Sequence, residues 1–359
     1  MTGRIPPAVS IPRSPLDVTP QWVESVLATE IRSVDVTPIG TGQTGATYRL
    51  AVRYAADVPD LPRSFAIKLS SQDDAVRERV ALGYRSEHAF YTEVADVVRV
   101  PIPTHFHCEI SSDGGDFVLL LADMAPAVQG DQIAGCPAEE AELAVRALAG
   151  LHGPTWCDPR WPEFEGLVMS TATEDAMKGL GDVAVLAAQM TLDRLGSRMT
   201  AEDRDTITES TSLVAPWLVA TRDRFALMHG DYRLDNLLFT PDRRHVTVVD
   251  WQTLGVGSPT RDLAYFTGTS LMPELRSVVD HDLVEAYFVE LSGYGITDYD
   301  LDTCWHDYRI GMVQVPFLSV LGCAFSVSTE RGDDMMLTMM ARGCQAIREL
   351  GSLDLIRGL

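Results

Sequence analysis

Positively charged residues are in short supply in this sequence. Lys and Arg number 29 against 51 Asp and Glu among 359 residues, which leaves a formal net charge of −22. Proteins that bind DNA or RNA neutralise phosphates with a surplus of Lys and Arg, and attachment to anionic membranes draws on the same surplus. We therefore expect neither a nucleic acid nor a membrane among the partners.

Cysteine pairs at metal-binding or redox spacing are also missing. The six cysteines are scattered and form no C-x-x-C motif, which removes the usual zinc-site and thioredoxin interpretations. A chain of this size needs no disulfides, so we expect reduced thiols. Residues 1–20 hold five prolines and no apolar run of the kind that a secretory leader needs, and we expect a cytoplasmic protein.

Charge is absent from one long segment, residues 310–329, which is mostly apolar. Its length would suffice to span a bilayer. Gln314, Pro316 and Ser319 interrupt it, however, and no basic cluster flanks it. We interpret the segment as a core helix of a soluble protein.

The remaining sequence pattern divides into a strand-rich part and a helical part. With 46% apolar residues the chain can form a sizeable core, and its length suggests about two domains or lobes. After a short predicted helix at 22–31, alternation predicts strands at 34–36, 48–54, 64–69, 106–110 and 117–121, and a helix at 75–98. Beyond an irregular stretch at 125–136, periodicity predicts helices at 138–151, 175–195, 201–221, 273–291 and 300–329, interrupted by short strands at 236–239 and 245–249.

A glycine-rich segment joins the first two predicted strands. Gly40, Gly42 and Gly45 form a G-x-G-x-x-G match, and the residues that follow alternate as in a strand. A dinucleotide-binding site requires a helix at that place, whereas a glycine loop between two strands covers nucleotide phosphates in kinases. An ordinary hairpin turn is the alternative interpretation of this motif.

One lysine, Lys68, stands inside the apolar predicted strand 64–69. A buried ammonium group is costly unless a carboxylate pairs with it. The following helix offers Glu87, which we prefer because it lies in the middle of the helix, with Glu78 and Glu93 as alternatives. A Lys68 that faced solvent from an edge strand would need no partner.

Three oxygen-bearing side chains are expected to meet at one edge of the helical part. Asp231 precedes the predicted hairpin, Asn236 begins its first strand, and Asp250 follows its second strand. Two carboxylates and an amide oxygen suit Mg²⁺, whereas the single nearby histidine, His229, serves zinc poorly. Turns closed by these side chains, or a helix cap at Asp250, form the alternative interpretation.

At this point the sequence resembles the aminoglycoside phosphotransferase family of kinase-like enzymes, and within it the ecdysteroid-kinase-like branch. The segments His229-Gly230-Asp231…Asn236 and Asp250-Trp251-Gln252 carry the resemblance. Supporting matches are Lys68 with Glu87, residues 148–152, Gly255, Pro259 and residues 262–265. The matches run from about residue 39 to residue 266, and the last ~90 residues match only in their helical character.

The resemblance implies an α+β, protein-kinase-like fold with two lobes and ATP between them. A flexible leader would cover residues 1–20, a small β-rich N-lobe residues 21–124, and a larger, mainly helical C-lobe residues 125–359. The implied activity is ATP- and Mg²⁺-dependent transfer of the γ-phosphate to a hydroxyl of a small molecule. A protein substrate is not expected, because the sequence has no Ala-Pro-Glu motif or activation loop. A nucleotide-binding pseudokinase or scaffold is the alternative.

The resemblance also implies roles for the predicted catalytic segment. Asp231 would accept the proton of the acceptor hydroxyl. Arg233 would stabilise the charge of the transferring phosphoryl group, with a solvent-facing arginine as the alternative. Asn236 and Asp250 would hold Mg²⁺.

The nucleotide contacts implied by the resemblance lie mainly in the first part of the chain. Lys68, paired with Glu87, would contact the α- and β-phosphates, and Gly40, Gly42 and Gly45 would cover them. The backbone of residues 121–124, including Ala122 and Met124, would hydrogen-bond adenine.

Two further residues and an acceptor pocket complete the implied site. His229 and Asp262 would support the catalytic loop without taking part in the chemistry. The acceptor pocket is expected in the helical C-terminal part. Eight aromatic and methionine residues there either line an apolar site or pack the core: Trp305, Tyr308, Met312, Phe317, Met335, Met336, Met339 and Met340.

Overall fold

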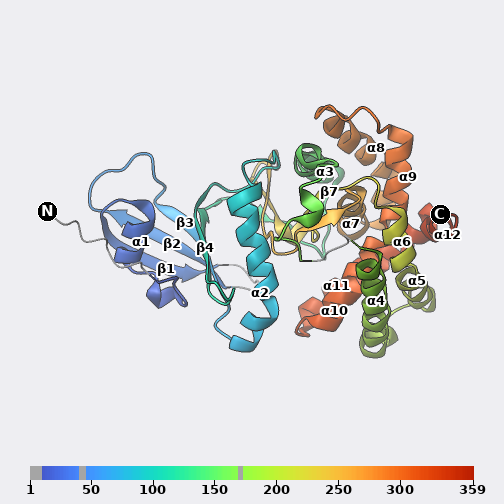
Figure 1. The fold of residues 1–359 in the computed structure, drawn as a ribbon, viewed down its shortest axis with the longest axis horizontal. Coiled ribbons are helices and arrows are strands. Elements are labelled where there is room, and N and C mark those ends of the chain that lie inside the picture. Colours follow the sequence, from blue (N-terminus) through green and yellow to red (C-terminus); the bar gives the residue numbers. More distant parts are fainter. Residues whose placement is uncertain (1–9, 40–45, 169–172) are drawn as a thin grey trace. The chain divides into compact units, whose positions relative to one another are not determined.

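The computed structural model describes residues 10–39, 46–168 and 173–359, and the chain divides into two compact units. Unit 1 comprises Met1–Ala95 and Ile102–Ala125, and unit 2 comprises Asp96–Pro101 and Pro126–Leu359. The strands of unit 1 are blue to teal in Figure 1, and the helices of unit 2 run from green to red.

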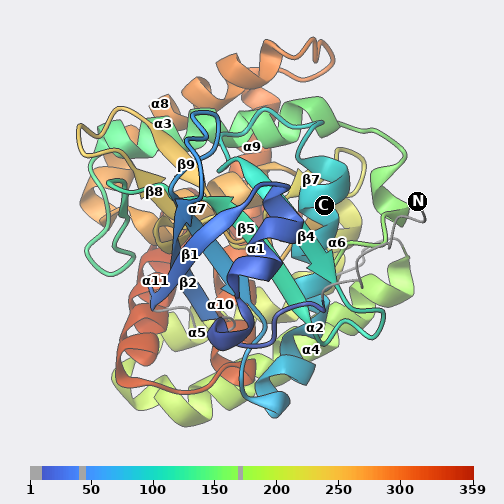
Figure 2. The ribbon, with the colours of Figure 1, turned by 90° about the vertical axis from the view of Figure 1, so that its left-hand side faces the viewer.

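Unit 1 is built on an antiparallel sheet that has five strands in its described part, in the order β1-β2-β3-β5-β4. The strands are β1 Ile31–Pro38, β2 Ala46–Tyr54, β3 Ser64–Leu69, β4 His105–Ile110 and β5 Phe117–Ala122. Helix α1 Pro20–Leu27 lies against one face of this sheet (Figure 2). Helix α2 Asp74–Ala89 follows β3 and continues as a π-helical turn over Phe90–Val94.

The core of unit 1 lies between α1 and the sheet. Trp22 and Val23 of α1 pack against the buried residues Phe65, Ile67 and Leu69 of β3. Successive side chains of a strand point to opposite faces. Lys68 therefore points away from this core, towards the other face of the sheet.

Helix α1 is shorter than the periodicity predicts. It ends at Leu27, and Ala28 adopts a left-handed conformation with φ at +50°. Ile31, which the spacing assigns to the helix, begins β1 instead. A residue in the left-handed region ends a helix by turning the chain away from its axis, and apolar spacing alone does not mark such an end.

Unit 2 is mainly helical. Its longer helices are α3 Ala138–His152, α4 Glu174–Leu195, α5 Ala201–Ser212, α6 Val214–Ala220, α7 Thr260–Ser270, α8 Pro273–Ser292, α9 Leu301–Gly311, α10 Gln314–Phe325, α11 Glu330–Leu350 and α12 Ser352–Arg357. Helices α3 and α8 lie side by side, and α4 packs against α6 and α10 (Figure 1). The fold as a whole is α+β, as the sequence predicts.

Two short ladders hold the segment that carries the predicted catalytic residues. Strand β8 Leu237–Phe239 lies between β6 Val128–Gln129 and β9 Val246–Val248. Strand β7 Ala226–Met228 pairs with β10 Gly255–Gly257. The hairpin of β8 and β9 is predicted from the sequence, whereas β7 and β10 are too short for an alternating pattern. The ladders anchor both ends of the segment between β7 and β10.

Several predicted helices differ from the observed ones in extent. The helices predicted at 201–221 and 300–329 are each broken, at Leu213 between α5 and α6 and at residues 312–313 between α9 and α10. Neither α7 nor α11 is among the predicted helices. Every residue of α7 is buried, so this helix has no polar face from which a helical period could be recognised.

The uncharged C-terminal segment belongs to two consecutive helices. Among the described residues, the run Leu301–Phe325 is long and apolar enough to cross a membrane by length and composition. In its most apolar window, 67% of the residues are buried inside the protein. A core helix of a soluble protein meets the same criteria, so this run is only weak evidence for a membrane span.

Candidate active site

The Asp231 carboxylate is the centre of a hydrogen-bonded group in the loop after β7. The Arg233 Nε lies 3.0 Å from each of its two oxygens, and the Tyr265 hydroxyl donates to Oδ1 at 3.1 Å. The Asn236 amide donates to Oδ2 at 3.0 Å and to the Asp231 carbonyl at 2.8 Å. The Asp231 side chain nevertheless keeps 29% of its surface exposed. The carboxylate is thus fixed in orientation and still open to a ligand.

Arg233 is held by two carboxylates and does not face solvent. Besides Asp231 it contacts Asp235, whose Oδ2 accepts from Nη1 at 2.7 Å. Its side chain is 16% exposed. Burial by itself lowers the pKa of Arg233, but Asp231 and Asp235 outweigh it and raise the pKa above the ordinary value. Arg233 therefore stays charged and orients Asp231.

The backbone of the loop is fixed by a buried carboxylate and an imidazole. Asp262 of α7 accepts from the amides of His229 at 2.7 Å and Gly230 at 3.1 Å. His229 Nδ1 accepts from the Asp231 amide at 3.3 Å, so its Nε2 carries the proton and donates to the Val249 carbonyl at 3.1 Å. His229 and Asp262 thus contact the loop's own backbone, as the sequence resemblance implies.

Gly230 is needed for the path of the chain just before Asp231. Its φ is +79°, a conformation that is strained for residues with a side chain. A Cβ at this position would lie 2.1 Å from the Thr253 carbonyl oxygen, which belongs to the segment after Asp250. The missing side chain therefore lets two backbone segments pass each other closely.

Replacing Gly230 by Ala should lower the free energy of unfolding by about 3 kcal/mol, from backbone strain and overpacking together. Urea denaturation measures the effect. Gly179→Ala is the matched control, because a Cβ at Gly179 meets nothing within 4 Å and the residue lies inside α4. That control should gain up to about 1 kcal/mol from helix propensity. Equal stability of Gly230→Ala and the natural protein would contradict this account of the loop.

Asn236 and Asp250 lie at the same edge of the β8–β9 hairpin. The Val249 amide donates to the Asn236 carbonyl at 3.0 Å, which places Asp250 directly after this contact. Asp250 has a φ of +68°, which is unusual for a residue other than glycine. Such strain is found at functional sites. At Asp250 the chain turns away from the direction of β9, which ends at Val248.

The oxygen atoms of this group fit a hard divalent cation. The Asn236 amide nitrogen is engaged by Asp231, and no residue in the described ranges donates to the Asn236 Oδ1. That oxygen and the carboxylate of Asp250 are the donor types that Mg²⁺ prefers. Asn236 is 5% exposed, so its amide is held firmly in one orientation. The donor set agrees with the sequence-based expectation of a magnesium site.

In unit 1, Lys68 pairs with Glu87 of α2. The Lys68 Nζ lies 2.8 Å from Glu87 Oε2 and 3.1 Å from Oε1, and the two side chains are 13% and 2% exposed. Glu78 and Glu93, the alternative partners, are both exposed. The preferred pairing is confirmed.

Removing one member of this pair should cost much of the stability of unit 1. Lys68→Met leaves a buried carboxylate without its cation and should lower the free energy of unfolding by about 3–5 kcal/mol. Adding Glu87→Gln to that variant should restore a large part of the loss. Thermal denaturation of the single and double variants measures this, with the exposed Lys178→Met as control. No recovery in the double variant would show that Lys68 stabilises unit 1 in another way.

The other predicted nucleotide contacts are placed only in part. Gly40, Gly42 and Gly45 lie outside the described residues. Ala122 ends β5, and its amide already donates to the Thr104 carbonyl at 2.8 Å. Met124 lies beyond the strand, and no residue in the described chain bonds to its backbone. A base that binds here would therefore use Met124, or the carbonyl but not the amide of Ala122.

Several supporting residues have roles that the sequence does not reveal. Tyr265 lies in the matched segment 262–265 but contacts Asp231 across 34 residues. Asp235 pairs with Arg233 and also accepts from the Gln132 amide at 3.2 Å. The Thr253 hydroxyl donates to the His229 carbonyl at 2.9 Å. Apart from the local Asp235–Arg233 pair, these contacts depend on how distant segments pack, and no local motif indicates them.

The expected methionine-rich acceptor site is mostly core. Of the eight residues proposed for it, Tyr308, Met312, Phe317, Met335, Met339 and Met340 are buried. Met335 packs beside the catalytic loop, where its sulfur lies 3.4 Å from Arg233 Nη1. The core-packing interpretation therefore holds for most of the set.

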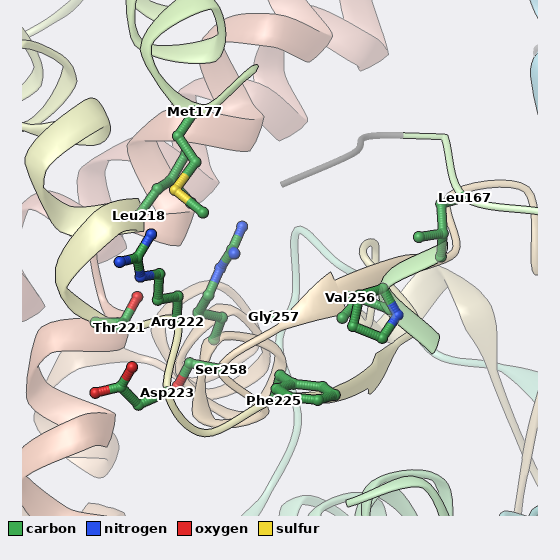
Figure 3. Close-up of a pocket in the computed structure, with 12 residues that line it drawn as sticks. Leu167, Met177, Leu218, Thr221, Arg222, Asp223, Phe225, Val256, Gly257 and Ser258 are labelled. Carbon is green, nitrogen blue, oxygen red and sulfur yellow. The ribbon is translucent and has the colours of Figure 1, made fainter. Parts of the chain in front are cut away.

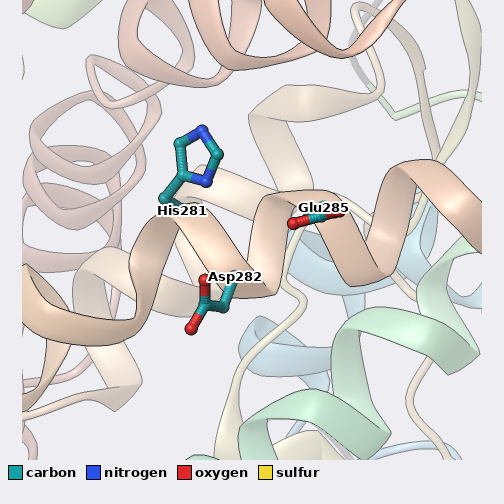
Figure 4. Close-up of side chains that lie close together, drawn as sticks. All are labelled: His281, Asp282 and Glu285. Carbon is teal, nitrogen blue, oxygen red and sulfur yellow. The ribbon is translucent and has the colours of Figure 1, made fainter.

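A group of possible metal ligands also lies on α8. The ligand atoms of His281, Asp282 and Glu285 are all within 4.8 Å of one another (Figure 4). All three side chains are exposed, and the His281 ring packs on Trp305 with centroids 5.1 Å apart. Exposed acidic groups gather in many proteins that bind no metal there, so we assign no site to this cluster.

Comparison with known proteins places the chain in a family. Residues 35–299, well over half of the chain, match the family model described as "Phosphotransferase enzyme family". Over 85 residues the chain is 38% identical to mouse acyl-CoA dehydrogenase family member 10. That match covers 20% of this chain and 8% of the relative, so the chain spans less than a tenth of that relative's length.

The fold is similar to that of solved phosphotransferases. Plasmodium vivax ethanolamine kinase superposes with a TM-score of 0.54 at 10% identity, over 92% of this chain and 85% of that one. The GDP and kanamycin complex of APH(2″)-IIIa superposes with a TM-score of 0.53 at 17% identity, over 92% and 97%. At such identities the likeness shows the fold alone. Together with the family match, it establishes that the chain belongs to the phosphotransferase enzyme family and has its kinase-like fold.

Proposed function

We propose that this protein transfers the γ-phosphate of ATP to a hydroxyl group of a small molecule, with Mg²⁺ as cofactor. The observation that carries the proposal is the state of Asp231. Its carboxylate is oriented by Arg233 and Tyr265 and is still 29% exposed. This is the arrangement that a proton acceptor for a substrate hydroxyl requires.

The catalytic work assigned to Asp231 is positioning and proton acceptance. Its oxygens would receive the hydroxyl hydrogen and direct the hydroxyl oxygen at the phosphorus atom. Because Arg233 is bound to both Asp231 and Asp235, its charge is already balanced by neighbouring carboxylates. We assign to Arg233 the task of holding Asp231, with phosphoryl stabilisation as a second task.

The metal would be held by Asn236 and Asp250. When bound, Mg²⁺ supplies positive charge to the phosphate oxygens of the nucleotide. The fixed amide of Asn236 presents its Oδ1, and the strained backbone at Asp250 sets the direction of that carboxylate.

Nucleotide contacts are assigned to Lys68 and to Met124 in unit 1. Glu87 fixes the Lys68 ammonium group, which would bind phosphate oxygens. Solved relatives of similar fold hold GDP in one case and ADP in another, so the choice between ATP and GTP is part of the test. Lys68, Asp231, Asn236 and Asp250 are all present, which favours an active enzyme over a scaffold without turnover.

The experiment is a screen for acceptor-dependent ADP formation. The natural protein is incubated with ATP or GTP, with and without Mg²⁺, against a panel of aminoglycosides, amino alcohols, sugars and hydroxylated carboxylic acids. We expect turnover that needs both Mg²⁺ and an acceptor. Nucleotide binding without turnover on any acceptor would support the scaffold alternative and contradict the proposal.

A further inference from the structure

A cavity of about 380 Å³ opens in unit 2 beside β10 and the end of α6 (Figure 3). Its volume is within the range of small-ligand pockets. Half of the residues in its wall are apolar, namely Pro162, Leu167, Met177, Leu218, Phe225 and Val256. Met177 and Leu218 lie on one side and Leu167 and Val256 on the other. None of the eight residues expected to form an acceptor site lines it.

The buried charged group in this wall is the guanidinium of Arg261. The residue is 4% exposed and packs on Trp217, with its Cζ 4.6 Å from the ring centroid. Its Nε donates to Gln314 Oε1 at 2.9 Å. Burial lowers the pKa of Arg261 to about 10, and Asp262 opposes this only in part. A buried cation in such surroundings is costly unless an anion comes close to it.

Other buried arginines of unit 2 have their terminal nitrogens satisfied. Arg276 pairs with Asp280 and Glu349, and Arg342 donates to three backbone carbonyls. For Arg261, by contrast, the described residues provide no carboxylate and no hydrogen-bond acceptor for Nη1 or Nη2. Its end-on pair of donors is therefore available to a ligand.

The neighbourhood of Arg261 has more donors than acceptors. Gln314 is fully buried, and its Nε2 has no partner within the part of the chain that the structure describes. A Cβ at Gly257 would lie 2.6 Å from Arg261 Nη1, so the glycine keeps the space beside the guanidinium clear. At the wall, Arg222 and Asp223 are exposed, and Arg222 pairs with Glu174. The buried part of the site is thus suited to an anion.

The cavity lies beside the pair of strands, β7 and β10, that leads into the catalytic loop. Gly257 of β10 pairs with Ala226 of β7, and Asp231 follows five residues later. Five residues span at most about 18 Å. A smaller hollow of about 10 Å³ has Arg261, Gln314 and Gly230 in its wall. The hollow shares Val256 and Arg261 with the cavity, so Arg261 lies between the cavity and the segment that leads to Asp231.

We propose that this cavity binds the acceptor and that Arg261 holds its carboxylate group, so that the substrate class is an apolar hydroxylated carboxylic acid. Two parallel bonds from Nη1 and Nη2 match the two oxygens of a carboxylate. The role of the hydroxyl rests on the proposed phosphotransfer. The binding of the carboxylate does not, and it can be measured without turnover.

The test compares octanoate with its neutral analogue octanamide by calorimetric titration of the full chain. The natural protein should bind octanoate at least about tenfold more tightly. Arg261→Met should abolish that preference, whereas Arg244→Met, at an exposed arginine that lines neither cavity, should keep it. Equal binding of the two probes by the natural protein, or a preference that survives Arg261→Met, would overturn the proposal.

A second variant leaves Arg261 in place, in case its loss prevents folding. Gly257→Ala places a methyl group against Nη1 and should weaken octanoate binding about tenfold while octanamide binding changes little. Unchanged octanoate affinity in this variant would count against the site. If the carboxylate preference depends on Arg261 but no acceptor gives ADP, carboxylate binding in the cavity is supported and the phosphotransfer proposal fails. Turnover of neutral alcohols without any carboxylate preference would instead support phosphotransfer and overturn the carboxylate site.

Discussion

Replacing Asp231 by Asn lowers the rate of phosphoryl transfer by about 10³-fold and leaves the affinity for ATP within about twofold. Asn has the same size, and its oxygen can still accept from Tyr265 and Arg233, while its NH₂ group loses the bond that Asp231 Oδ2 accepts from Asn236. What is lost is the charge that accepts the hydroxyl proton. Steady-state rates and calorimetric titration with ATP measure the two effects separately.

The control for this variant is Asp235→Asn. Asp235 contacts the same guanidinium as Asp231, with 2.7 Å between its Oδ2 and Arg233 Nη1, but the proposal gives it no contact with the reacting atoms. We expect it to lose less than about tenfold in rate. A loss of ATP affinity as large as the loss of rate in Asp231→Asn would show that Asp231 serves nucleotide binding rather than chemistry.

Replacing Asp250 by Asn should weaken the dependence of ATP binding on Mg²⁺, because the amide keeps one oxygen ligand but loses the charge of the carboxylate. In the natural protein Mg²⁺ should increase the affinity for ATP on the order of 100-fold or more, because loss of even an indirect metal contact typically costs 10–100-fold. Asn tolerates the left-handed backbone at this position nearly as well as Asp does. The variant therefore changes the ligand and not the fold, and titration with ATP at fixed Mg²⁺ concentrations measures the result.

Asp250→Gly provides an independent check of the same assignment. Glycine adopts a φ of +68° without strain, and it too lacks the carboxylate. This variant should bind ATP with and without Mg²⁺ about equally. A normal response to Mg²⁺ in Asp250→Gly would exclude Asp250 as a metal ligand.

Much of unit 1 can be predicted from local sequence, because its strands have one buried face. The alternation of Phe65, Ile67 and Leu69 indicates both the strand β3 and the exceptional position of Lys68. The sequence cannot choose between Glu87 and its alternatives with certainty, because the choice depends on which side of α2 faces the sheet. The buried position of Glu87 settles it.

In the candidate site, too, contacts between residues close in the sequence can be predicted, whereas contacts between distant segments cannot. The spacing of Asp231, Asn236 and Asp250 follows from one hairpin, which the sequence indicates. The contacts of Tyr265, Asp235 and Gln132 arise from packing between segments that are far apart in the chain. The cavity at Arg261 is of this second kind. Arg261 stands beside the matched Asp262 in the sequence, but nothing in the sequence indicates that its side chain is buried without a carboxylate partner.

The net charge of −22 makes the distribution of cations important. ATP is anionic, and so is the acceptor class inferred from Arg261. Two of its positive groups are buried and fixed by a neighbouring side chain, Lys68 by Glu87 and Arg261 by Gln314. Local positioning of this kind can bind an anion within an acidic protein, because buried interactions are screened much less than those at the surface.

Phosphorus NMR of a complete reaction tests the central claim most directly. The sample contains the natural protein, ATP, Mg²⁺ and the acceptor that gives the most ADP in the screen. A phosphomonoester signal should grow in step with ADP, and it should be absent when Mg²⁺ is chelated or Asp231 is replaced by Asn. Unchanged ATP with every acceptor of the panel, or ADP that appears together with inorganic phosphate and no phosphomonoester, would contradict the assignment of this protein as a small-molecule phosphotransferase.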